Sequence, residues 1–506
     1  MPQPGGFRRV AVIGAGPAGA IATDALAKEQ AFDVIRVFDR RAVAGGTWVY
    51  TPHLPPALPS LPALLSNTAD VPLPPTLIPS SFPSETEKSE TVNNHQLRFS
   101  DSAQHEHLHS NIHPDIMSYS DFPFPPTLSS RILSRYGKDA PFRHREVIRQ
   151  WIENIFVTGG YFEKGWVELS TTVERAEKVN GEWVLTLRKE EGLLGGKDYW
   201  WQEKFDALVV GTGHYNVPWI PDLLGLKEYD ERWKGRVAHS KFFRRGDKYK
   251  GKKVLVTGAS VSAHEIVHEI LPFAQHPVQV AIRGQPIPAF GWTPFLHPHI
   301  NVIKSEIERF DPITGGIHFK NGTKLDDIDH VIFATGYTFS FPWLPVLQER
   351  VKKAYRRLPG VYQHTFDVLD PSLTFVGMLG GGFTFRVYEW QAVAVARHLA
   401  GRARPLPSIA AQQLWEAKRV ADKKGGKDYY SLAPDYEEYF EFLRNIARDP
   451  APGTTGRVLP KFDKQWLVTW KEMVAPKLKA FEEERKRAEE DDRGKKTGGK
   501  GLKAKL

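Results

Sequence analysis

The chain has 506 residues, of which 41% are hydrophobic and 25% charged, a composition typical of soluble globular proteins. Its formal net charge is +9, but no stripe of basic and aromatic residues stands out, so no nucleic-acid partner is expected. It contains no cysteine, which excludes disulfides, zinc–thiolate sites and a redox-active cysteine pair. Because no secretory signal and no apolar run of roughly 18 to 20 residues is visible, we expect a cytoplasmic protein without a membrane anchor.

The chain opens on a strand–glycine–helix pattern. The predicted unit consists of a strand at residues 9–13, a helix at 20–28 and a strand at 34–38. Gly14, Gly16 and Gly19 follow the first strand in the spacing G-x-G-x-x-G, which allows a tight turn, close backbone approach to a pyrophosphate and close packing of helix on strand. Asp39 ends the second strand, where a carboxylate accepts hydrogen bonds from a ribose. The pattern predicts a βαβ unit that binds FAD or NAD.

The middle of the chain is less regular. Residues 51–97 are rich in proline, serine and leucine without any period, which predicts an inserted surface loop. The elements predicted after it are a helix at 145–156, short strands at 166–172, 173–178 and 183–188, and a buried strand at 205–210. That last strand ends at residues 211–214, Gly-Thr-Gly-His, a further place where a glycine turn follows a strand.

A second βαβ unit is predicted, with a strand at 253–257, a helix at 261–271 and a strand at 278–282. Gly258 takes the first glycine position, whereas Ser260 and Ala263 take the second and third. Alanine is tolerated in the third, but the Cβ of a serine crowds a phosphate, to which its hydroxyl can donate instead. Arg283 stands where an acid would bind the ribose, and a guanidinium can pair with a 2′-phosphate. The unit is predicted to bind NADPH rather than NADH; the alternative is an ordinary α/β unit with a surface arginine.

The remaining elements complete the predicted architecture. They are a buried strand at 330–333, a strand at 373–377, a helix at 391–399 and, from residue 481, a charged helix that breaks into a Gly/Lys-rich tail. The predicted fold class is α/β, with two Rossmann-like dinucleotide-binding domains, the NADPH domain being inserted into a discontinuous FAD domain. The predicted domains are an FAD domain at 1–215 with the proline-rich insert 51–97, an NADPH domain at 216–330, the second part of the FAD domain with C-terminal helices at 331–480, and a charged flexible tail at 481–506.

Two dinucleotide sites in a chain without cysteine suggest hydride transfer from NADPH to a flavin, with oxygen as the simplest next electron acceptor. No Ser/His/Asp or metal-ligand arrangement competes with this interpretation. His105, His107, His109 and His113 gather in one loop, but their spacing is irregular, so no metal site is predicted.

Several motifs resemble those of the flavin-containing monooxygenases. Residues 233–243, WKGRVAHSKFF, resemble the family pattern F-x-G-x-x-x-H-x-x-x-Y/F through Gly235, His239 and Phe243, with Trp233 in place of the leading phenylalanine. Other similar segments are Gly45-Gly46-Thr47-Trp48, Asn111 with Met117 and residues 121–125, the ATGY sequence at 334–337, and Gln391-Ala392. Related Baeyer–Villiger enzymes carry a tryptophan at the last pattern position, so Phe243 followed by Arg244 favours the branch that oxidises heteroatoms. Asp39 in place of the usual glutamate and Ser260 in place of glycine are departures.

The resemblance implies an NADPH- and O2-dependent FAD monooxygenase that passes oxygen from a flavin hydroperoxide to a nucleophilic nitrogen or sulfur of a small-molecule amine, thiol or sulfide. It implies that Asn111 is the catalytic residue, in contact with the region where flavin, nicotinamide and oxygen meet. The implied FAD contacts are Gly14, Gly16, Pro17, Ala18, Gly19, Asp39, Arg40, Gly46, Thr47, Trp48, Asn111, Met117, Val173 and Gln391. The implied NADP contacts are Gly258, Ser260, Ser262, Ala263, Arg283 and Thr335.

Two alternative functions share this architecture: a Baeyer–Villiger monooxygenase acting on ketones, and a flavin reductase that oxidises NADPH without oxygen transfer. The last residues, Ala504-Lys505-Leu506, resemble the peroxisomal tripeptide S-K-L, so a peroxisomal location stands beside the cytoplasmic one. The sequence leaves open the substrate, the choice between nitrogen and sulfur, and the oligomeric state, a homodimer included.

Overall fold

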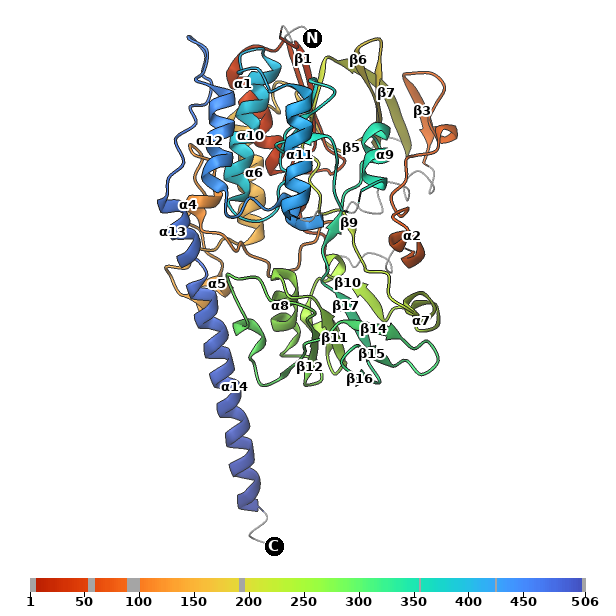
Figure 1. The fold of residues 1–506 in the computed structure, drawn as a ribbon, viewed down its shortest axis with the longest axis vertical. Coiled ribbons are helices and arrows are strands. Elements are labelled where there is room, and N and C mark those ends of the chain that lie inside the picture. Colours follow the sequence, from red (N-terminus) through yellow and green to blue (C-terminus); the bar gives the residue numbers. More distant parts are fainter. Residues whose placement is uncertain are drawn as a thin grey trace.

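The computed structural model describes residues 6–52, 60–88, 101–190, 196–354, 356–423 and 426–502. These residues form two units, each built on a mainly parallel sheet, which lie one above the other in Figure 1. The long C-terminal helix α14 (Ala475–Leu502) runs from the upper unit down along the lower one (Figure 1). No helix in these described ranges is long and apolar enough to cross a membrane.

The upper unit contains a seven-stranded sheet. Its strands, in sheet order, are β19 (Val361–Tyr362), β20 (Phe366–Asp367), β21 (Leu373–Phe375), β8 (Ala207–Val210), β1 (Arg9–Ile13), β2 (Val34–Phe38) and β4 (Val167–Glu168). β1 pairs in parallel with β2 on one side and β8 on the other. The central strands are buried because helices cover parallel sheets on both faces, which explains their unbroken apolar sequences. The strands predicted at 9–13 and 34–38 are confirmed.

The lower unit contains a five-stranded parallel sheet. Its strands, in sheet order, are β10 (Val237–His239), β17 (His330–Phe333), β11 (Val254–Thr257), β12 (Val278–Ala281) and β13 (Ile300–Ile303). The chain enters this unit after β8 and leaves it before β21, so the predicted insertion of one Rossmann-like domain into another is confirmed. The two connections pair with each other as the short strands β9 (Val217–Pro218) and β18 (Tyr337–Thr338).

Helices pack around both sheets. They include α1 (Pro17–Glu29), α2 (Leu61–Leu65), α4 (Pro114–Met117), α5 (Ser130–Tyr136), α6 (Arg145–Thr158), α7 (Leu226–Arg232), α8 (Val261–Ile270), α9 (Pro345–Lys352), α10 (Thr384–Leu399), α11 (Ile409–Lys423), α12 (Tyr436–Ala447) and α13 (Gln465–Glu472). α1 and α8 follow the two glycine motifs directly, and α1 packs against α10. α10 begins seven residues earlier than predicted, because nearly all its residues are buried and no amphipathic period marks its start.

The proline-rich insert is more regular than predicted. Its described part contains α2 and the strand β3 (Ser84–Glu87). β3 extends an antiparallel sheet whose other strands are β7 (Lys197–Phe205), β6 (Glu182–Glu190) and β5 (Thr171–Val179). The prediction of a structureless loop was therefore wrong at these positions, and the prediction missed β7. Both β3 and β7 are rich in charged and polar residues, which hides their strand character from an apolar pattern. A further three-stranded sheet in the lower unit contains β14 (Ile307–Phe310), β15 (Ile317–Phe319) and β16 (Lys324–Leu325).

The C-terminal segment is helical from residue 481, as predicted, although a break into a flexible Gly/Lys-rich tail was also expected there. It belongs to α14, which continues to Leu502. Glu484 forms an ion pair with Arg135 at 2.8 Å and lies 3.0 Å from Nδ1 of His268, and Asp492 lies 3.1 Å from His299. The sequence suggested that these charged side chains face solvent. Instead they attach α14 to both units, because Arg135 lies on α5, before the chain enters the lower unit, and His268 lies on α8, within the lower unit.

Candidate functional site

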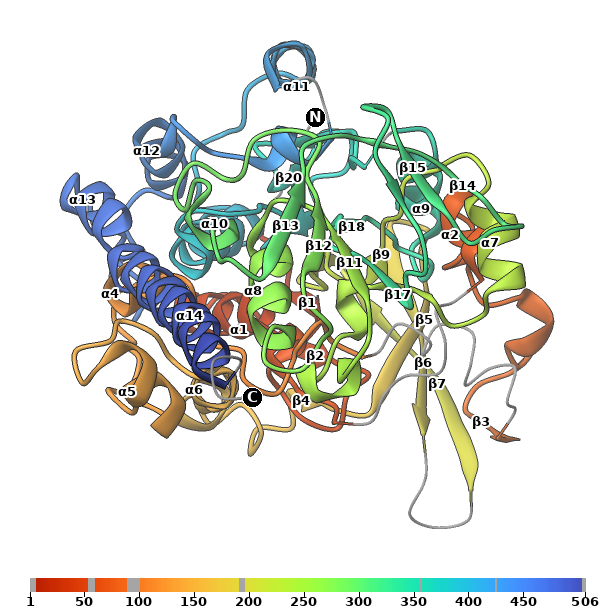
Figure 2. The same ribbon diagram turned by 90° about the horizontal axis from the view of Figure 1, so that it is seen from below.

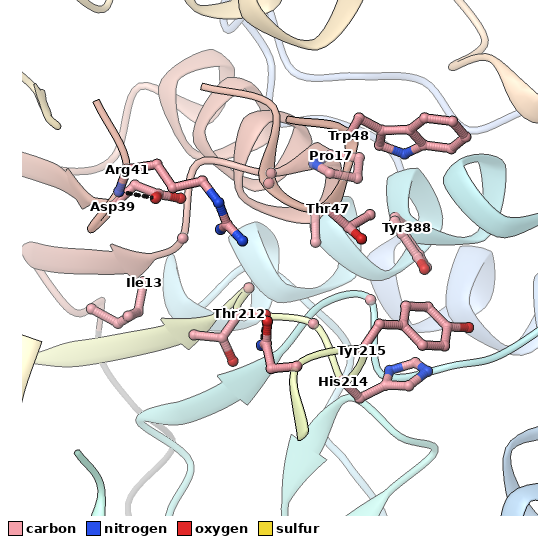
Figure 3. Close-up of a pocket in the computed structure, with 18 of the residues that line it drawn as sticks. Ile13, Pro17, Asp39, Arg41, Thr47, Trp48, Thr212, His214, Tyr215 and Tyr388 are labelled. Atoms are coloured by element: carbon pink, nitrogen blue, oxygen red, sulfur yellow. Dashed lines mark hydrogen bonds between the residues drawn. The ribbon is translucent and has the colours of Figure 1, made fainter. Parts of the chain in front are cut away.

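A cavity of about 330 Å³ lies at the carboxyl ends of β1 and β8. Its wall is formed by the turns after these two strands, by the 3-10 helix η1 (Gly46–Trp48) and by the start of α10. Figure 3 shows Pro17, Thr47 and Trp48 on one side of the space and His214 and Tyr215 on the other. Open α/β sheets bind their ligands in this kind of crevice, beyond the carboxyl ends of adjacent parallel strands.

The turn after β1 has no room for side chains. A Cβ on Gly19 would lie 1.7 Å from the carbonyl oxygen of Gly14, and a Cβ on Gly46 would lie 2.7 Å from the Cα of Gly16. No side chain caps the N-terminus of α1, so its first backbone N–H groups remain available to an anion. This bare backbone cradle on the cavity wall fits the pyrophosphate of a dinucleotide.

Asp39 holds the cradle in shape. One carboxylate oxygen accepts a hydrogen bond from the backbone N–H of Ala15 at 2.7 Å, and the other accepts one from the backbone N–H of Arg41 at 2.8 Å. The contact with Arg41 is drawn as a dashed line in Figure 3. Asp39 also lines the cavity, and each carboxylate oxygen can accept a second hydrogen bond. The residue predicted to bind a ribose is therefore also a support for the glycine turn.

Most of the predicted FAD contacts line this cavity. They are Gly14, Gly16, Pro17, Ala18, Asp39, Arg40, Gly46, Thr47, Trp48, Asn111, Met117 and Val173. Gly19 and Gln391 do not line it. Gly19 serves the packing of α1 on the turn, whereas the Gln391 side chain accepts from the backbone N–H of Gly377 at 2.9 Å and donates to the Tyr439 hydroxyl at 3.0 Å. Since Gly377 lines the cavity, Gln391 supports the wall from behind.

The prediction missed the contribution of the turn after β8 and of α10. The residues concerned include Thr212, His214, Tyr215, Phe385 and Tyr388. Burial lowers the pKa of His214 to about 4 and raises the pKa of both tyrosines, so these rings are neutral near pH 7. The glycine turn at 211–214 was visible in the sequence. Its place beside the first motif follows only from the pairing of β8 with β1.

Arg40 adds a positive charge to the wall of the same cavity. Burial and, to a lesser extent, the neighbouring charge of Arg41 lower the pKa of the Arg40 guanidinium to about 10. The group therefore stays protonated at neutral pH, and both arginines line the cavity. A cavity with a bare helix N-terminus and two guanidinium groups suits an anionic ligand.

The residues of the second motif meet at the equivalent edge of the lower sheet. Gly258 follows β11, Arg283 lies two residues beyond β12, and Thr335 lies two residues beyond β17. Because β17, β11 and β12 are parallel neighbours, these residues lie at adjacent strand ends. Ser260 directly precedes α8, and Ser262 and Ala263 lie in its first turn. None of these six residues lines the cavity of the upper unit, so the second motif does not share that cavity.

The segment that resembles the family pattern connects the two units. His239 ends β10 and is fully buried, and its Nδ1 accepts a hydrogen bond from the backbone N–H of Lys241 at 3.1 Å. Burial lowers the pKa of His239 to about 3, so the ring is neutral. It packs edge-on against Tyr337 of β18, 5.3 Å between ring centroids. These contacts favour a structural role for His239, which packs beside the pair of short strands, β9 and β18, that connect the two units.

The sequence profile of the flavin-binding monooxygenase-like family matches residues 96–287 and 296–450, more than half of the chain. The chain belongs to this family. This flavin monooxygenase is 31% identical over 485 residues to the flavin-containing monooxygenase iboF of Amanita muscaria, an alignment that covers 86% of this chain and 85% of iboF. It is 31% identical over 412 residues to flavin-containing monooxygenase FMO GS-OX4 of Arabidopsis thaliana, covering 81% and 77% of the two chains.

The fold of the monooxygenase is also found among solved structures. The S-allyl-L-cysteine S-oxygenase of Allium sativum superposes with a TM-score of 0.68 over 94% of both chains, at 22% sequence identity. Flavin monooxygenases of this family use FAD and NADPH, and they act on O2 and a small molecule. The bare glycine cradle and the guanidinium groups of the upper cavity fit FAD. The resemblance inferred from the sequence motifs is thus confirmed.

Proposed function

We propose that this monooxygenase uses NADPH and O2 to oxygenate a nucleophilic nitrogen or sulfur atom of a small molecule. One observation supports the proposal: the turn with Gly14 and Gly16, Trp48 and Asn111 line one cavity, while Arg283 stands at a strand end of the adjoining unit. FAD supplies the redox chemistry, in which NADPH gives two electrons, one oxygen atom goes to the substrate and the other leaves as water.

In this proposal the residues of the chain bind and orient the two cofactors and shield the reacting region from water. The backbone N–H groups at the start of α1 bind the pyrophosphate of FAD, and Asp39 fixes the turn that presents them. Arg283 is the partner we assign to the 2′-phosphate of NADPH. The buried, neutral ring of Tyr388 lines the cavity and would help to keep bulk water from the reacting region. Asn111 offers an amide to that region, and no acid–base pair is required.

We infer the substrate class from the kind of atom that would be oxygenated, a nucleophilic nitrogen or sulfur, and not from the shape of a substrate pocket. The segment 233–243 ends in Phe243, and Arg244 follows it, which favours heteroatoms as the site of oxidation. One protein of the same fold is named an S-oxygenase of S-allyl-L-cysteine. We infer a thioether, thiol or amine as substrate for this chain. A ketone substrate would place it with the Baeyer–Villiger enzymes instead.

The test begins with the purified holoenzyme, which we expect to be yellow and to lose its flavin absorbance when NADPH is added without oxygen. Oxygen, NADPH and a panel of sulfides, amines and ketones are then supplied, and products and hydrogen peroxide are measured. An S-oxide or N-oxide formed in proportion to NADPH supports the proposal. A lactone or ester as the main product, or one peroxide per NADPH with every compound, contradicts it in favour of the two alternatives.

For the location, which the sequence leaves between cytoplasm and peroxisome, we make a separate proposal. Ala504-Lys505-Leu506 lie outside the described residues, and we infer from their sequence a peroxisomal import signal. A fluorescent protein fused to the N-terminus leaves this tripeptide free. We expect the fusion to gather in peroxisomes and to become diffuse when the three residues are deleted. The same distribution with and without the tripeptide would mean that it is not used as a signal.

A further inference from the structure

The first turn of α14 buries a lysine against the flavin cavity. Lys477 is 1% exposed and lies in a part of the sequence that no motif marks. Its ammonium donates to the side-chain oxygen of Asn111, which lines the cavity, and to a carboxylate oxygen of Glu265 on α8 at 3.1 Å. Figures 1 and 2 show α14 next to the loop region before α6 and along the lower unit. One side chain thus joins three distant segments.

The contact decides which way the Asn111 amide faces. An ammonium group can only donate hydrogen bonds, so the carbonyl oxygen of the amide must face Lys477. The NH2 group is then turned away from the lysine. Since Asn111 itself belongs to the cavity wall, its NH2 group is the part left to act as a donor there. Without the lysine, the amide could rotate by half a turn at little cost.

The buried ammonium is balanced by Glu265. Burial opposes the ionisation of this carboxyl, but the Lys477 ammonium and nearby imidazoles hold its pKa well below its usual range. The other titratable groups around the pair include His105 and His109 from the same loop as Asn111, His264 from α8, and Arg135 and Tyr136 from α5. Phe142 packs beneath the ammonium, with its ring centroid 5.1 Å away. Lys477 and Glu265 thus form a buried ion pair where the upper and lower units meet.

We propose that Lys477 is a positioning residue of the monooxygenase. It holds the Asn111 amide with its NH2 group toward the flavin cavity and ties that amide, through Glu265, to the helix that follows the second glycine motif. The inference rests on the proposed function, because its main effect is on how NADPH oxidation is divided between substrate oxygenation and release of hydrogen peroxide. A donor held in one orientation supports productive oxygen transfer, whereas a freely rotating amide does not.

The variants are chosen to keep the protein folded. Lys477→Met alone leaves the Glu265 carboxylate buried without its counter-charge, which is strongly destabilising. The main variant is therefore Lys477→Met combined with Glu265→Gln, which removes both charges together. Lys479→Met is the matched control, since this lysine lies on the same helix with its side chain 77% exposed. Asn111→Ala, alone and added to the paired substitution, tests whether the lysine acts through the asparagine.

For the paired variant we expect FAD content and anaerobic flavin reduction within about twofold of wild type, and a peroxide fraction raised about fivefold or more. Lys479→Met should match wild type. The triple variant should release no more peroxide than Asn111→Ala, because effects on one pathway do not add. A paired variant with the wild-type peroxide fraction, or a triple variant whose effects add, would overturn the proposal.

Two measurements on the holoenzyme do not depend on oxygen transfer. Titration of the oxidised enzyme with NADP⁺ should change the flavin absorbance differently in the paired variant and in the Lys479→Met control. The midpoint of thermal unfolding should fall further for Lys477→Met than for the paired variant, because only the single substitution leaves an unpaired charge. If wild type forms no oxygenated product, the proposed function fails by itself, and the NADP⁺ titration still decides the positioning role of Lys477. Identical results for Lys477→Met and Lys479→Met would refute it.

Discussion

Asp39→Asn is the substitution that most directly tests how the flavin cradle is built. The carboxylate accepts hydrogen bonds from two backbone N–H groups, those of Ala15 and Arg41, and its side chain is almost fully buried. Asparagine has one acceptor oxygen, so one of the two N–H groups would face an NH2 group instead. A hydrogen bond to a charged group contributes about 1.5–3 kcal/mol, and an unpaired buried N–H costs about 1–3 kcal/mol.

If the distorted turn must be restored before FAD binds, a cost of about 1.5–3 kcal/mol weakens FAD binding by roughly 10- to 150-fold. The assay is titration of flavin-free protein with FAD, followed by the quenching of flavin fluorescence. Asp33→Asn is the control, because this exposed residue of the same βαβ unit forms a surface ion pair with Arg8. An Asp39→Asn variant that binds FAD within twofold of wild type would refute the reasoning.

Three further predictions concern the two nucleotide sites and the pH range of stability. Arg283→Ala should raise the KM for NADPH about 10- to 100-fold and that for NADH by less than about twofold, since only NADPH carries the 2′-phosphate; equal changes would remove the assignment. Gly19→Ala should purify with little flavin absorbance, because its Cβ would meet the Gly14 carbonyl at 1.7 Å, whereas Gly284→Ala, which has nothing within 4 Å, should stay yellow. A flavin-loaded Gly19→Ala protein would contradict the packing argument. His264 has its pKa lowered by burial to about 3, so the unfolded chain binds a proton first as pH falls below about 6.5, and the folded state loses about 2 kcal/mol by pH 5. In urea unfolding, His264→Leu should lose about that much less between pH 7 and pH 5, and equal losses in both proteins would show that this histidine does not titrate as inferred.

The parts of the fold that could be predicted from the sequence are those specified by neighbouring residues. β1, β2 and β17 were predicted with their bounds because buried parallel strands are continuous apolar runs that end in glycine, aspartate or alanine turns. Residues close to these turns, such as Gly16 and Asp39, lie in the cavity as expected.

The parts that could not be predicted depend on contacts across the whole chain. Lys477 and Asn111 are 366 positions apart, and nothing near residue 477 distinguishes that lysine from the many around it. Gln391 was expected to contact FAD because it belongs to a family motif, but its side chain forms hydrogen bonds with Gly377 and Tyr439 behind the cavity wall. β7 and β3, which pair with each other, are rich in charged and polar side chains, so an apolar period did not reveal either strand.

The insertion of one unit into the other has a consequence for the order in which the protein assembles. The strands of the lower sheet all lie between Val237 and Phe333, so this sheet can form as soon as that stretch has been synthesised. β8 must wait for β21, its parallel neighbour, and until then exposes an unpaired edge that other chains could bind. Once the lower unit has folded, β9 and β18 meet, and the long loop between β8 and β21 is closed in advance. We therefore expect the inserted unit to bring β8 and β21 close together before the sheet at the upper cavity is complete.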